Sequence, residues 1–260
     1  MEHVLGQGWE VFPAGGATGE AFFAQHDQQK LFLKRNSSPF LAVLSAEGIV
    51  PKLIWTKRLE NGDVITAQKW LSGAELKPDD MMGERVAKLL SKIHASQPLL
   101  SMLERLGKKI CQPAMMIEVL GKELDKDVQS DTRVKEAFLF LKEHLSGVSH
   151  EEYVVCHGDV NHNNWLLTDD NQLYLIDWDS AMIGDPAIDI GMLLYWYIPE
   201  ENWEEWLQQY GLVLTPHLRL RMKWYMVAQT LQSIQWHKNK QRFHEMDGWL
   251  NYLHTLLTQE

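Results

Sequence analysis

The sequence predicts an α+β protein with two lobes, a small β-rich lobe at residues 1–70 and a larger, mainly helical lobe at residues 71–260. Strand-like apolar runs and a glycine-rich turn gather in the first lobe. Apolar residues at helical spacing fill most of the second lobe, which also contains one short hairpin pattern. A chain of 260 residues can bury a substantial core as one two-lobed unit or as two domains.

The first lobe opens with a candidate phosphate-binding loop at residues 13–19, PAGGATG. The strand-like runs AFFA at residues 21–24 and KLFLKR at residues 30–35 follow it. Two strands beside a glycine-rich turn can lie over phosphates, although such turns are also common connectors. The candidate contacts in this loop are Gly15, Gly16, Thr18 and Gly19.

Lys34 is the candidate cation of this lobe. The strand period of two puts Leu31 and Leu33 on one face and Phe32 and Lys34 on the other, so Lys34 is expected to project toward a cleft. The alternative is an ordinary exposed lysine at a strand end, beside Arg35. Together with the second-lobe motif described below, the pattern favours a contact between Lys34 and phosphate.

Capped segments connect and build the two lobes. Ser38 and Pro39 are good cap and first-turn residues and Gly48 is a good terminator, which predicts a short helix between them. VITAQKWLSG at residues 64–73 indicates a strand that runs into a linker. Helical patterns then occupy residues 84–94, 113–125, 132–146, 187–197, 202–210, 216–238 and 243–257.

Three metal- and proton-handling residues, Asp159, Asn164 and Asp177, recur around one predicted hairpin. Its strands are WLL at residues 165–167 and LYLI at residues 173–176. The midpoint between Asn164 and Asp177 falls at the centre of the turn, so the two are expected to lie opposite each other, with Cβ atoms roughly 5 Å apart. An amide oxygen and a carboxylate at that separation suit Mg²⁺. Taken singly, each residue has an alternative role as a turn or cap residue.

The spacing of five from Asp159 to Asn164 is that of the protein-kinase catalytic loop, although Gly158 replaces the arginine of that loop. HGDVNHNN, followed by IDWD and GDPAIDI, resembles the aminoglycoside phosphotransferase and choline kinase family, and its thiamine and choline kinase-like branch most of all. The resemblance implies a protein-kinase-like fold. It also implies transfer of the γ-phosphoryl group of ATP to a hydroxyl of a small molecule, with ATP and Mg²⁺ as cofactors.

The resemblance also implies roles for individual residues. Asp159 would orient or deprotonate the acceptor hydroxyl, while Asn164 and Asp177 would hold Mg²⁺. Lys34 would steady the phosphates, and backbone groups from Gln68 to Trp70 would hydrogen-bond adenine.

Two further aspects concern the support of the site. His157 and Asp189 are assigned structural roles, because Asp189 resembles the aspartate that ties the catalytic loop to the following helix. The alternative for Asp189 is a helix-start residue next to the cap at Asp185. Relatives also carry a helical glutamate that pairs with the strand lysine. Here Glu47 lies in the last turn of its short helix, which predicts weak nucleotide affinity or another partner for Lys34.

The acceptor is the least determined part of the prediction. Trp178 and Asp179 adjoin Asp177 and are the best candidates for acceptor contacts. The chain has 11 tryptophans, and aromatic faces attract the cations of choline-like or thiamine-like molecules. Aminoglycoside-like acceptors remain an alternative, and core packing is the expected role of most aromatic residues after residue 194.

Two other functions compete with the kinase prediction. One is a kinase-fold protein that binds a nucleotide or metabolite without transfer, favoured by the missing helical glutamate and opposed by the intact aspartates and asparagine. The other is a phosphohydrolase that uses Zn or Mn, which would leave the first lobe unexplained. Its candidate ligands are His157, Asp159, His162, Asp177 and Asp179.

Composition limits the partners of the protein. With 25 basic and 35 acidic residues the formal charge is −10, which argues against nonspecific nucleic-acid binding. The longest plainly apolar run, residues 190–198, is far shorter than the roughly 20 residues that span a bilayer. The first residues lack a secretory signal, and Cys111 and Cys156 are too few for a disulfide framework. We therefore expect a cytoplasmic protein whose partner is a small-molecule acceptor; its oligomeric state is unknown.

Overall fold

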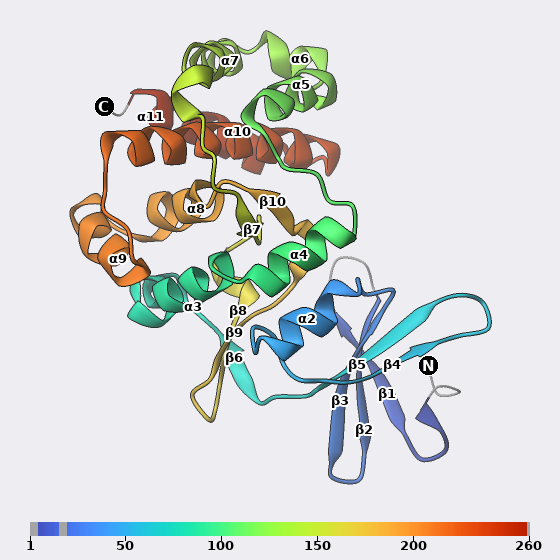
Figure 1. The fold of residues 1–260 in the computed structure, drawn as a ribbon. Coiled ribbons are helices and arrows are strands. Elements are labelled where there is room, and N and C mark those ends of the chain that lie inside the picture. Colours follow the sequence, from blue (N-terminus) through green and yellow to red (C-terminus); the bar gives the residue numbers. More distant parts are fainter. Residues whose placement is uncertain (1–4, 16–19, 259–260) are drawn as a thin grey trace.

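The computed structural model describes residues 5–15 and 20–258 and confirms the predicted α+β fold of two lobes (Figure 1). The small lobe is a five-stranded sheet in which every neighbouring pair is antiparallel. In order across the sheet, its strands are β1 (Glu10–Gly15), β2 (Ala21–His26), β3 (Gln29–Arg35), β5 (Val64–Lys69) and β4 (Leu53–Arg58).

The two faces of this sheet differ in burial. Phe23 lies opposite Phe32 and Ala21 lies opposite Lys34 in the β2–β3 register. Because side chains alternate along a strand, Phe23, Phe32 and Lys34 share one face. The other face holds the small apolar core of the lobe, which consists of Ala24, Leu33, Ile65 and Ala67.

The prediction of a flexible loop over residues 13–19 is wrong for its first part. Strand β1 continues to Gly15, and Pro13 lies opposite Phe22. Proline is tolerated there because β1 is an edge strand, and the register shifts between Pro13 and Gly15. The other candidate phosphate contacts, Gly16, Thr18 and Gly19, lie outside the described residues.

The large lobe is mainly helical. Every helix predicted from the sequence is present, and two unpredicted helices, α4 and α6, are added to them. The helices of this lobe are α3 (Glu84–His94), α4 (Gln97–Arg105), α5 (Pro113–Glu123), α6 (Lys126–Ser130), α7 (Thr132–Glu143), α8 (Ala187–Tyr197), α9 (Trp203–Tyr210), α10 (Pro216–Asn239) and α11 (Phe243–Thr258). Helix α4 begins at a clear start signal, because the hydroxyl of Ser96 accepts the amide of Leu99 and a proline lies in the first turn.

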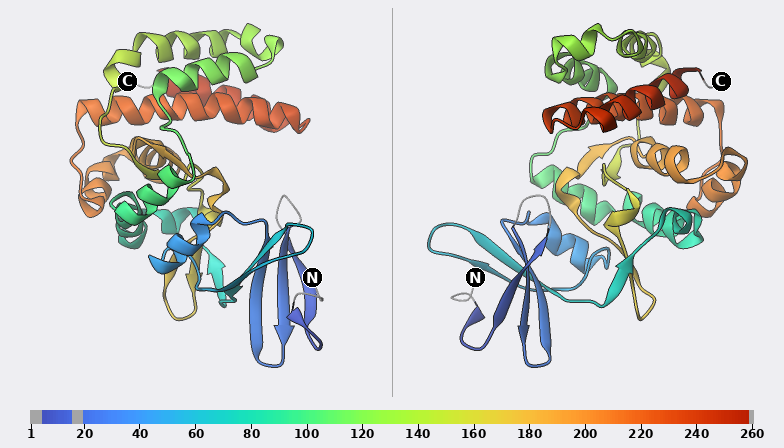
Figure 2. Two further views of the ribbon diagram at one scale, coloured as in Figure 1. Left: turned by 45° about the vertical axis from the view of Figure 1, so that its right-hand side comes forward. Right: turned by 180° about the vertical axis from the view of Figure 1, so that it is seen from behind.

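Helix α8 lies at the centre of this lobe and is apolar all round, which is typical of a helix buried on every side. It packs on α10, which in turn packs on α11 and α7. Figures 1 and 2 show α5, α6 and α7 at the end of the molecule farthest from the sheet. No helix in the described part of the chain combines the length and apolar character needed to cross a membrane.

Helix α2 (Phe40–Ala46) packs on the large lobe although the chain forms it between two strands of the sheet. Phe40 and Leu44 belong to the core of the large lobe, and the ring of Phe40 lies 5.7 Å from that of Trp178. The amide of Leu175 also donates to the carbonyl of Ile49 at 3.0 Å. The boundary at residue 70 stays a prediction, and this segment makes contacts across it.

Short strands in the large lobe carry the motif residues. β7 (Val154–Cys156) pairs with β10 (Met182–Gly184), and β6 (Gly73–Glu75) pairs with β8 (Trp165–Thr168). The predicted hairpin is confirmed as β8 and β9 (Leu173–Leu175).

The predicted register of this hairpin is wrong by one residue. Trp165 lies opposite Leu175, so Asn164 faces Ile176, whose amide donates to the Asn164 carbonyl at 2.8 Å. The physical reason is the three-residue loop between Thr168 and Gln172. The last residue of this loop, Asn171, adopts a left-handed backbone conformation. Asp177 therefore lies one residue beyond the pair that contains Asn164.

Candidate active site

The loop between β7 and β8, residues 157–164, carries the first part of the site. It turns at Gly158, whose φ of +79° is a conformation that favours glycine. A Cβ atom at this position would lie 2.9 Å from the Met182 side chain and 3.0 Å from the Ser180 carbonyl. Gly158 therefore permits both the turn and the close approach of the segment after Asp177.

Asp159 is held by the amide groups of two asparagines. Its Oδ1 accepts from Asn161 Nδ2 at 2.6 Å, and its Oδ2 accepts from Asn164 Nδ2 at 3.1 Å. Asn164 Nδ2 also donates to the Asp159 carbonyl at 2.7 Å. Because the nitrogen of Asn164 makes both of these bonds, its Oδ1 is left as an acceptor, which is the atom that a hard cation would use.

Asp189 holds the start of the loop between β7 and β8, residues 157–164. It is fully buried, and its oxygens accept the backbone amides of His157 at 2.7 Å and Gly158 at 2.9 Å. His94 Nε2 adds a third contact at 3.0 Å. Burial alone would raise the pKa of Asp189, but the hydrogen bond and charge of His94, followed by His157 and Gly158, lower it below its ordinary value. This geometry matches the structural role that the family resemblance implies.

His157 is also buried, and both of its ring nitrogens face a bonding partner. Nε2 lies 2.9 Å from the carbonyl of Ile176, and Nδ1 accepts the amide of Asp159 at 3.2 Å. The ring therefore joins the catalytic loop to the end of the hairpin. Because both nitrogens are engaged, His157 is not available as a metal ligand.

Asp177 follows the hairpin in a left-handed backbone conformation, with φ 62° and ψ 66°. This conformation is uncommon outside glycine and is typical of functional sites, where surrounding contacts maintain it. Here both neighbours of Asp177 are held. The Ile176 carbonyl contacts the His157 ring, and the Trp178 indole donates to the Leu175 carbonyl at 2.7 Å. The carboxylate of Asp177 is half-exposed and reaches Lys34 of the small lobe.

Lys34 extends from the sheet to the large lobe. Its Nζ lies 3.0 and 3.1 Å from the two oxygens of Asp179 and 3.3 Å from Oδ1 of Asp177. Burial lowers the pKa of Lys34, but the hydrogen bond and charge of Asp179, followed by those of Asp177, outweigh it and raise the pKa above its ordinary value. The structure thus brings one predicted residue of the small lobe to two predicted residues of the large lobe.

The segment predicted to bind adenine, from Gln68 to Trp70, offers aromatic contacts more than free backbone groups. The Gln68 amide group turns to the Pro51 carbonyl at 2.8 Å, and the amide of Trp70 donates to Lys30 within the sheet at 3.2 Å. The Trp70 amide is therefore engaged, and the prediction that backbone groups from Gln68 to Trp70 bind adenine stays a prediction for the other groups. Its indole, however, lies 4.7 Å from the ring of Phe23, on the sheet face that carries Lys34.

Three residues of the site were not predicted as site residues. Asn161 holds Asp159, His94 holds Asp189, and the hydroxyl of Tyr197 accepts the amide of His162 at 3.1 Å. Asn161 lies two residues after Asp159 at a helix cap, which is a usable local signal. His94 and Tyr197 arrive from distant helices, and no local pattern indicates their contacts.

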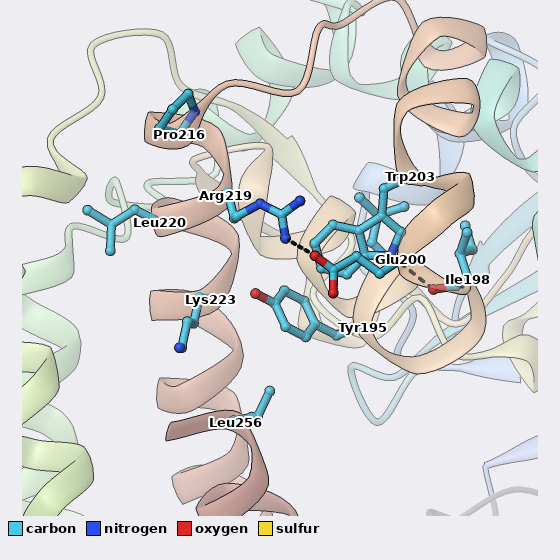
Figure 3. Close-up of a pocket in the computed structure, with 10 residues that line it drawn as sticks. Tyr195, Ile198, Glu200, Trp203, Pro216, Arg219, Leu220, Lys223 and Leu256 are labelled. Carbon is cyan, nitrogen blue, oxygen red and sulfur yellow. Dashed lines mark hydrogen bonds and ion pairs between the residues drawn. The ribbon is translucent and has the colours of Figure 1, made fainter. Parts of the chain in front are cut away.

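A separate cavity of about 360 Å³ lies between α8, α10 and α11 and contains none of the predicted site residues (Figure 3). Arg219 pairs with Glu200 at its edge and lies 5.0 Å from the ring of Trp203. Burial raises the pKa of Tyr195, which lines this cavity, to about 12. The residues predicted for catalysis therefore lie outside this cavity.

Comparison with known proteins identifies the family. The family model described as the phosphotransferase enzyme family matches residues 10–225. The chain belongs to this family. The match includes Lys34 and extends past Asp189, so it covers both lobes and every described motif of this phosphotransferase.

Solved structures of similar fold support the family. Choline kinase LicA from Streptococcus pneumoniae has a TM-score of 0.71 and 17% identity, over 95% of this chain and 92% of that chain. A choline/ethanolamine kinase family protein from Mesorhizobium loti has a TM-score of 0.69 and 18% identity, over 96% and 88%. Spectinomycin phosphotransferase APH(9)-Ia, in complex with ADP and spectinomycin, has a TM-score of 0.63 and 16% identity, over 96% and 92%. These similarities confirm the kinase-like fold.

The chemistry of the donors tests which metal suits the site. Asn164 Oδ1 and the carboxylate of Asp177 are oxygen donors, which suit Mg²⁺ better than Zn. Within the described residues, the group with metal-ligand geometry is His94, Cys156 and Asp189, and all three are buried. The oxygens of Asp189 already accept the bonds described above, and the Cys156 thiol donates to the Asp185 carbonyl at 3.3 Å. This group is structural.

Proposed function

We propose that this phosphotransferase is a Mg²⁺-dependent small-molecule kinase that moves the γ-phosphoryl group of ATP to a hydroxyl of a small, cationic acceptor. The observation that carries the proposal is the meeting of Lys34 with Asp177 and Asp179 across the cleft. A cation from the sheet and carboxylates from the large lobe lie where a metal-bound triphosphate needs both.

Asp159 is the proposed base. Asn161 and Asn164 fix its two carboxylate oxygens, so that the remaining lone pairs have a defined direction. Such an aspartate orients the acceptor hydroxyl and accepts its proton as the phosphoryl group is transferred. Catalysis then depends mostly on positioning and on neutralising charge.

Asn164 and Asp177 are the residues that would hold Mg²⁺, through Oδ1 and a carboxylate oxygen. A bound Mg²⁺ would neutralise charge on the phosphates and orient them. Lys34 would add a second positive charge next to the phosphates, from the opposite lobe. The face that carries Lys34 also presents Phe23 and Trp70, whose rings can stack on a nucleotide base.

A cationic acceptor is supported by partly exposed aromatic side chains next to the catalytic loop. Tyr197 contacts His162 of that loop, and its neighbour Trp196 lies 5.6 Å from the ring of Trp249. Aromatic faces attract organic cations, and the formal charge of −10 acts in the same direction. By contrast, Trp203, Trp206, Trp224 and Tyr225 are buried in the core, as expected for most aromatic residues of this lobe.

The test is ADP formation from ATP with Mg²⁺ and pooled small alcohols, namely choline, ethanolamine, thiamine, homoserine, amino sugars and aminoglycosides. We expect acceptor-dependent ADP formation from one pool. Asp159→Asn should retain ATP affinity and lose turnover by roughly 100-fold or more, since a positioned base contributes on that scale. Normal turnover in Asp159→Asn would show that Asp159 is not the base.

The two competing functions differ in the same assay. A nucleotide-binding protein without transfer would bind ATP and form no ADP with any pool. A metal-dependent phosphohydrolase would release phosphate without an acceptor and would lose this activity on chelation of Zn or Mn. The pairing of Lys34 with Asp179 weakens the first alternative, because the missing helical glutamate no longer leaves the lysine unsupported.

A further inference from the structure

We infer that Asp179 positions Lys34 in this protein, in place of a helical glutamate, and that it is not a contact for the acceptor. The inference rests on the proposed function only for the statement that Lys34 contacts phosphates. It changes the sequence-based interpretation of Asp179 and assigns the lysine a partner from the opposite lobe.

The first step is that helix α2 cannot supply this partner. Its only glutamate, Glu47, is the C-terminal cap of the helix, and its Oε2 lies 3.4 Å from the hydroxyl of Ser96 in the large lobe. The Lys92 ammonium also donates to the Glu47 carbonyl. Since Phe40 and Leu44 anchor α2 in the large core, the helix is not free to turn Glu47 toward Lys34.

The second step is that Asp179 makes the more complete contact. Both of its oxygens lie within 3.1 Å of Lys34 Nζ, whereas Asp177 contributes one oxygen at 3.3 Å. Charge-assisted bonds of this kind hold a flexible lysine side chain in one orientation.

The third step is a division of roles between the two carboxylates. A metal ion at Asp177 would remove the single 3.3 Å contact and leave both contacts from Asp179. Asp179 can therefore hold Lys34 while Asp177 is engaged elsewhere. Because Lys34 lies on the sheet and Asp179 follows the hairpin of the other lobe, the position of the lysine depends on how the two lobes close.

The experiment compares Asp179→Asn with Glu47→Gln, which makes the same chemical change at the helical glutamate. Nucleotide affinity is measured by equilibrium binding of ATP with Mg²⁺. We expect Asp179→Asn to weaken ATP binding by roughly tenfold, the scale of one charge-assisted hydrogen bond, and Glu47→Gln to leave it unchanged. Asp179→Glu should restore most of the affinity. The double variant Lys34→Met/Asp179→Asn should bind no more weakly than Lys34→Met alone.

A second readout needs no nucleotide. Trace acylation of Lys34 by acetic anhydride, followed by mass spectrometry, reports how accessible its amine is. Loss of the Asp179 carboxylate removes the two shortest contacts of this amine and should speed labelling by about threefold or more in the free protein. The same labelling rate in Asp179→Asn and wild type would overturn the inference.

Other outcomes separate this inference from the proposed function. Faster labelling of Lys34 in a protein that binds no ATP would support the pairing and overturn the kinase proposal. A rise in the acceptor KM of Asp179→Asn with unchanged ATP affinity would overturn the inference and show that Asp179 contacts the acceptor. Weaker ATP binding in Glu47→Gln and not in Asp179→Asn would show that the helical glutamate positions Lys34 instead.

Discussion

At the scale of single residues, the site depends on polar groups that hold one another in defined orientations. Asp159, the proposed base, is held by asparagine amides, and the loop before it is held by Asp189. Buried networks of this kind are costly when one member is removed, because the remaining groups lose their partners. Stability and catalysis are therefore connected through Asp189 without any contact between it and a substrate.

Asp189→Asn tests this connection. The variant removes the buried carboxylate charge that the loop amides and the His94 ring contact, so we expect a loss of about 3 kcal/mol in the free energy of unfolding at pH 7. The pKa of Asp189 is lower in the folded protein than its ordinary value of 3.8. A lowered pKa stabilises the fold above the unfolded-state pKa, and this stabilisation is lost as the pH falls through the folded-state pKa. The difference between wild type and variant should therefore shrink below about pH 3.8.

Urea unfolding from pH 7 down to pH 3 measures this difference. Asp127→Asn is the matched control, because it makes the same change at an exposed ion pair with Lys238. We expect it to leave the free energy of unfolding nearly unchanged. Equal stability of Asp189→Asn and wild type at pH 7 would mean that the aspartate is a helix-start residue and not the support of the loop.

At the scale of elements, the two faces of the sheet have separate tasks. One face carries the small apolar core, and the other carries Lys34, Phe23 and Trp70. Phe23→Ala should weaken ATP affinity by roughly tenfold, since stacking of a base on an aromatic ring contributes on that scale. Phe243→Ala, at a phenylalanine that is 59% exposed on α11, should not change it. Isothermal titration with ATP and Mg²⁺ measures both affinities. It decides whether Phe23 stacks on the base or is an exposed ring without that role.

Local patterns predicted most of these elements, including the hairpin and the helices on either side of it. They failed where distant contacts or turn geometry decide the outcome. The hairpin register was predicted one residue off because Asn171 adopts a left-handed conformation and makes the loop odd in length. The sequence predicts a loop from Pro13 because proline and glycines favour turns, yet pairing with β2 keeps β1 extended as far as Gly15.

The candidate site shows the same limit. Spacing and the family resemblance select Lys34, Asp159, Asn164 and Asp177. The structure pairs Asp159 with Asn164 and Lys34 with Asp177. The pairing of Lys34 with Asp179 joins residues 145 positions apart, so no sequence window contains it. Nor does any local pattern show that α2 packs on the large lobe and carries Glu47 away from the lysine.

At the scale of the whole molecule, two cores of very different size are joined by polar contacts across a cleft. Among the described residues, the core of the small lobe contains four buried ones, whereas that of the large lobe extends from α2 to α11. The ion pairs of Lys34 with Asp177 and Asp179 connect the sheet to the large lobe. A nucleotide that binds in this cleft contacts both lobes and should stabilise them together.

Asp177→Ala tests how much of that stabilisation depends on metal. A ligand that binds only the folded protein adds about 2.7 kcal/mol at 100 times its Kd, so saturating ADP with Mg²⁺ should raise the Tm of the wild type by several degrees. Removal of the Asp177 carboxylate eliminates a ligand of the metal, and we expect the Mg²⁺-dependent part of the shift to disappear. The smaller shift with ADP and a chelator should remain, because Lys34 still has Asp179 to hold it.

Asp169→Ala, at an exposed aspartate in the turn of the same hairpin, should keep the full shift. A full Mg²⁺-dependent shift in Asp177→Ala would mean that the metal is held elsewhere in the cleft.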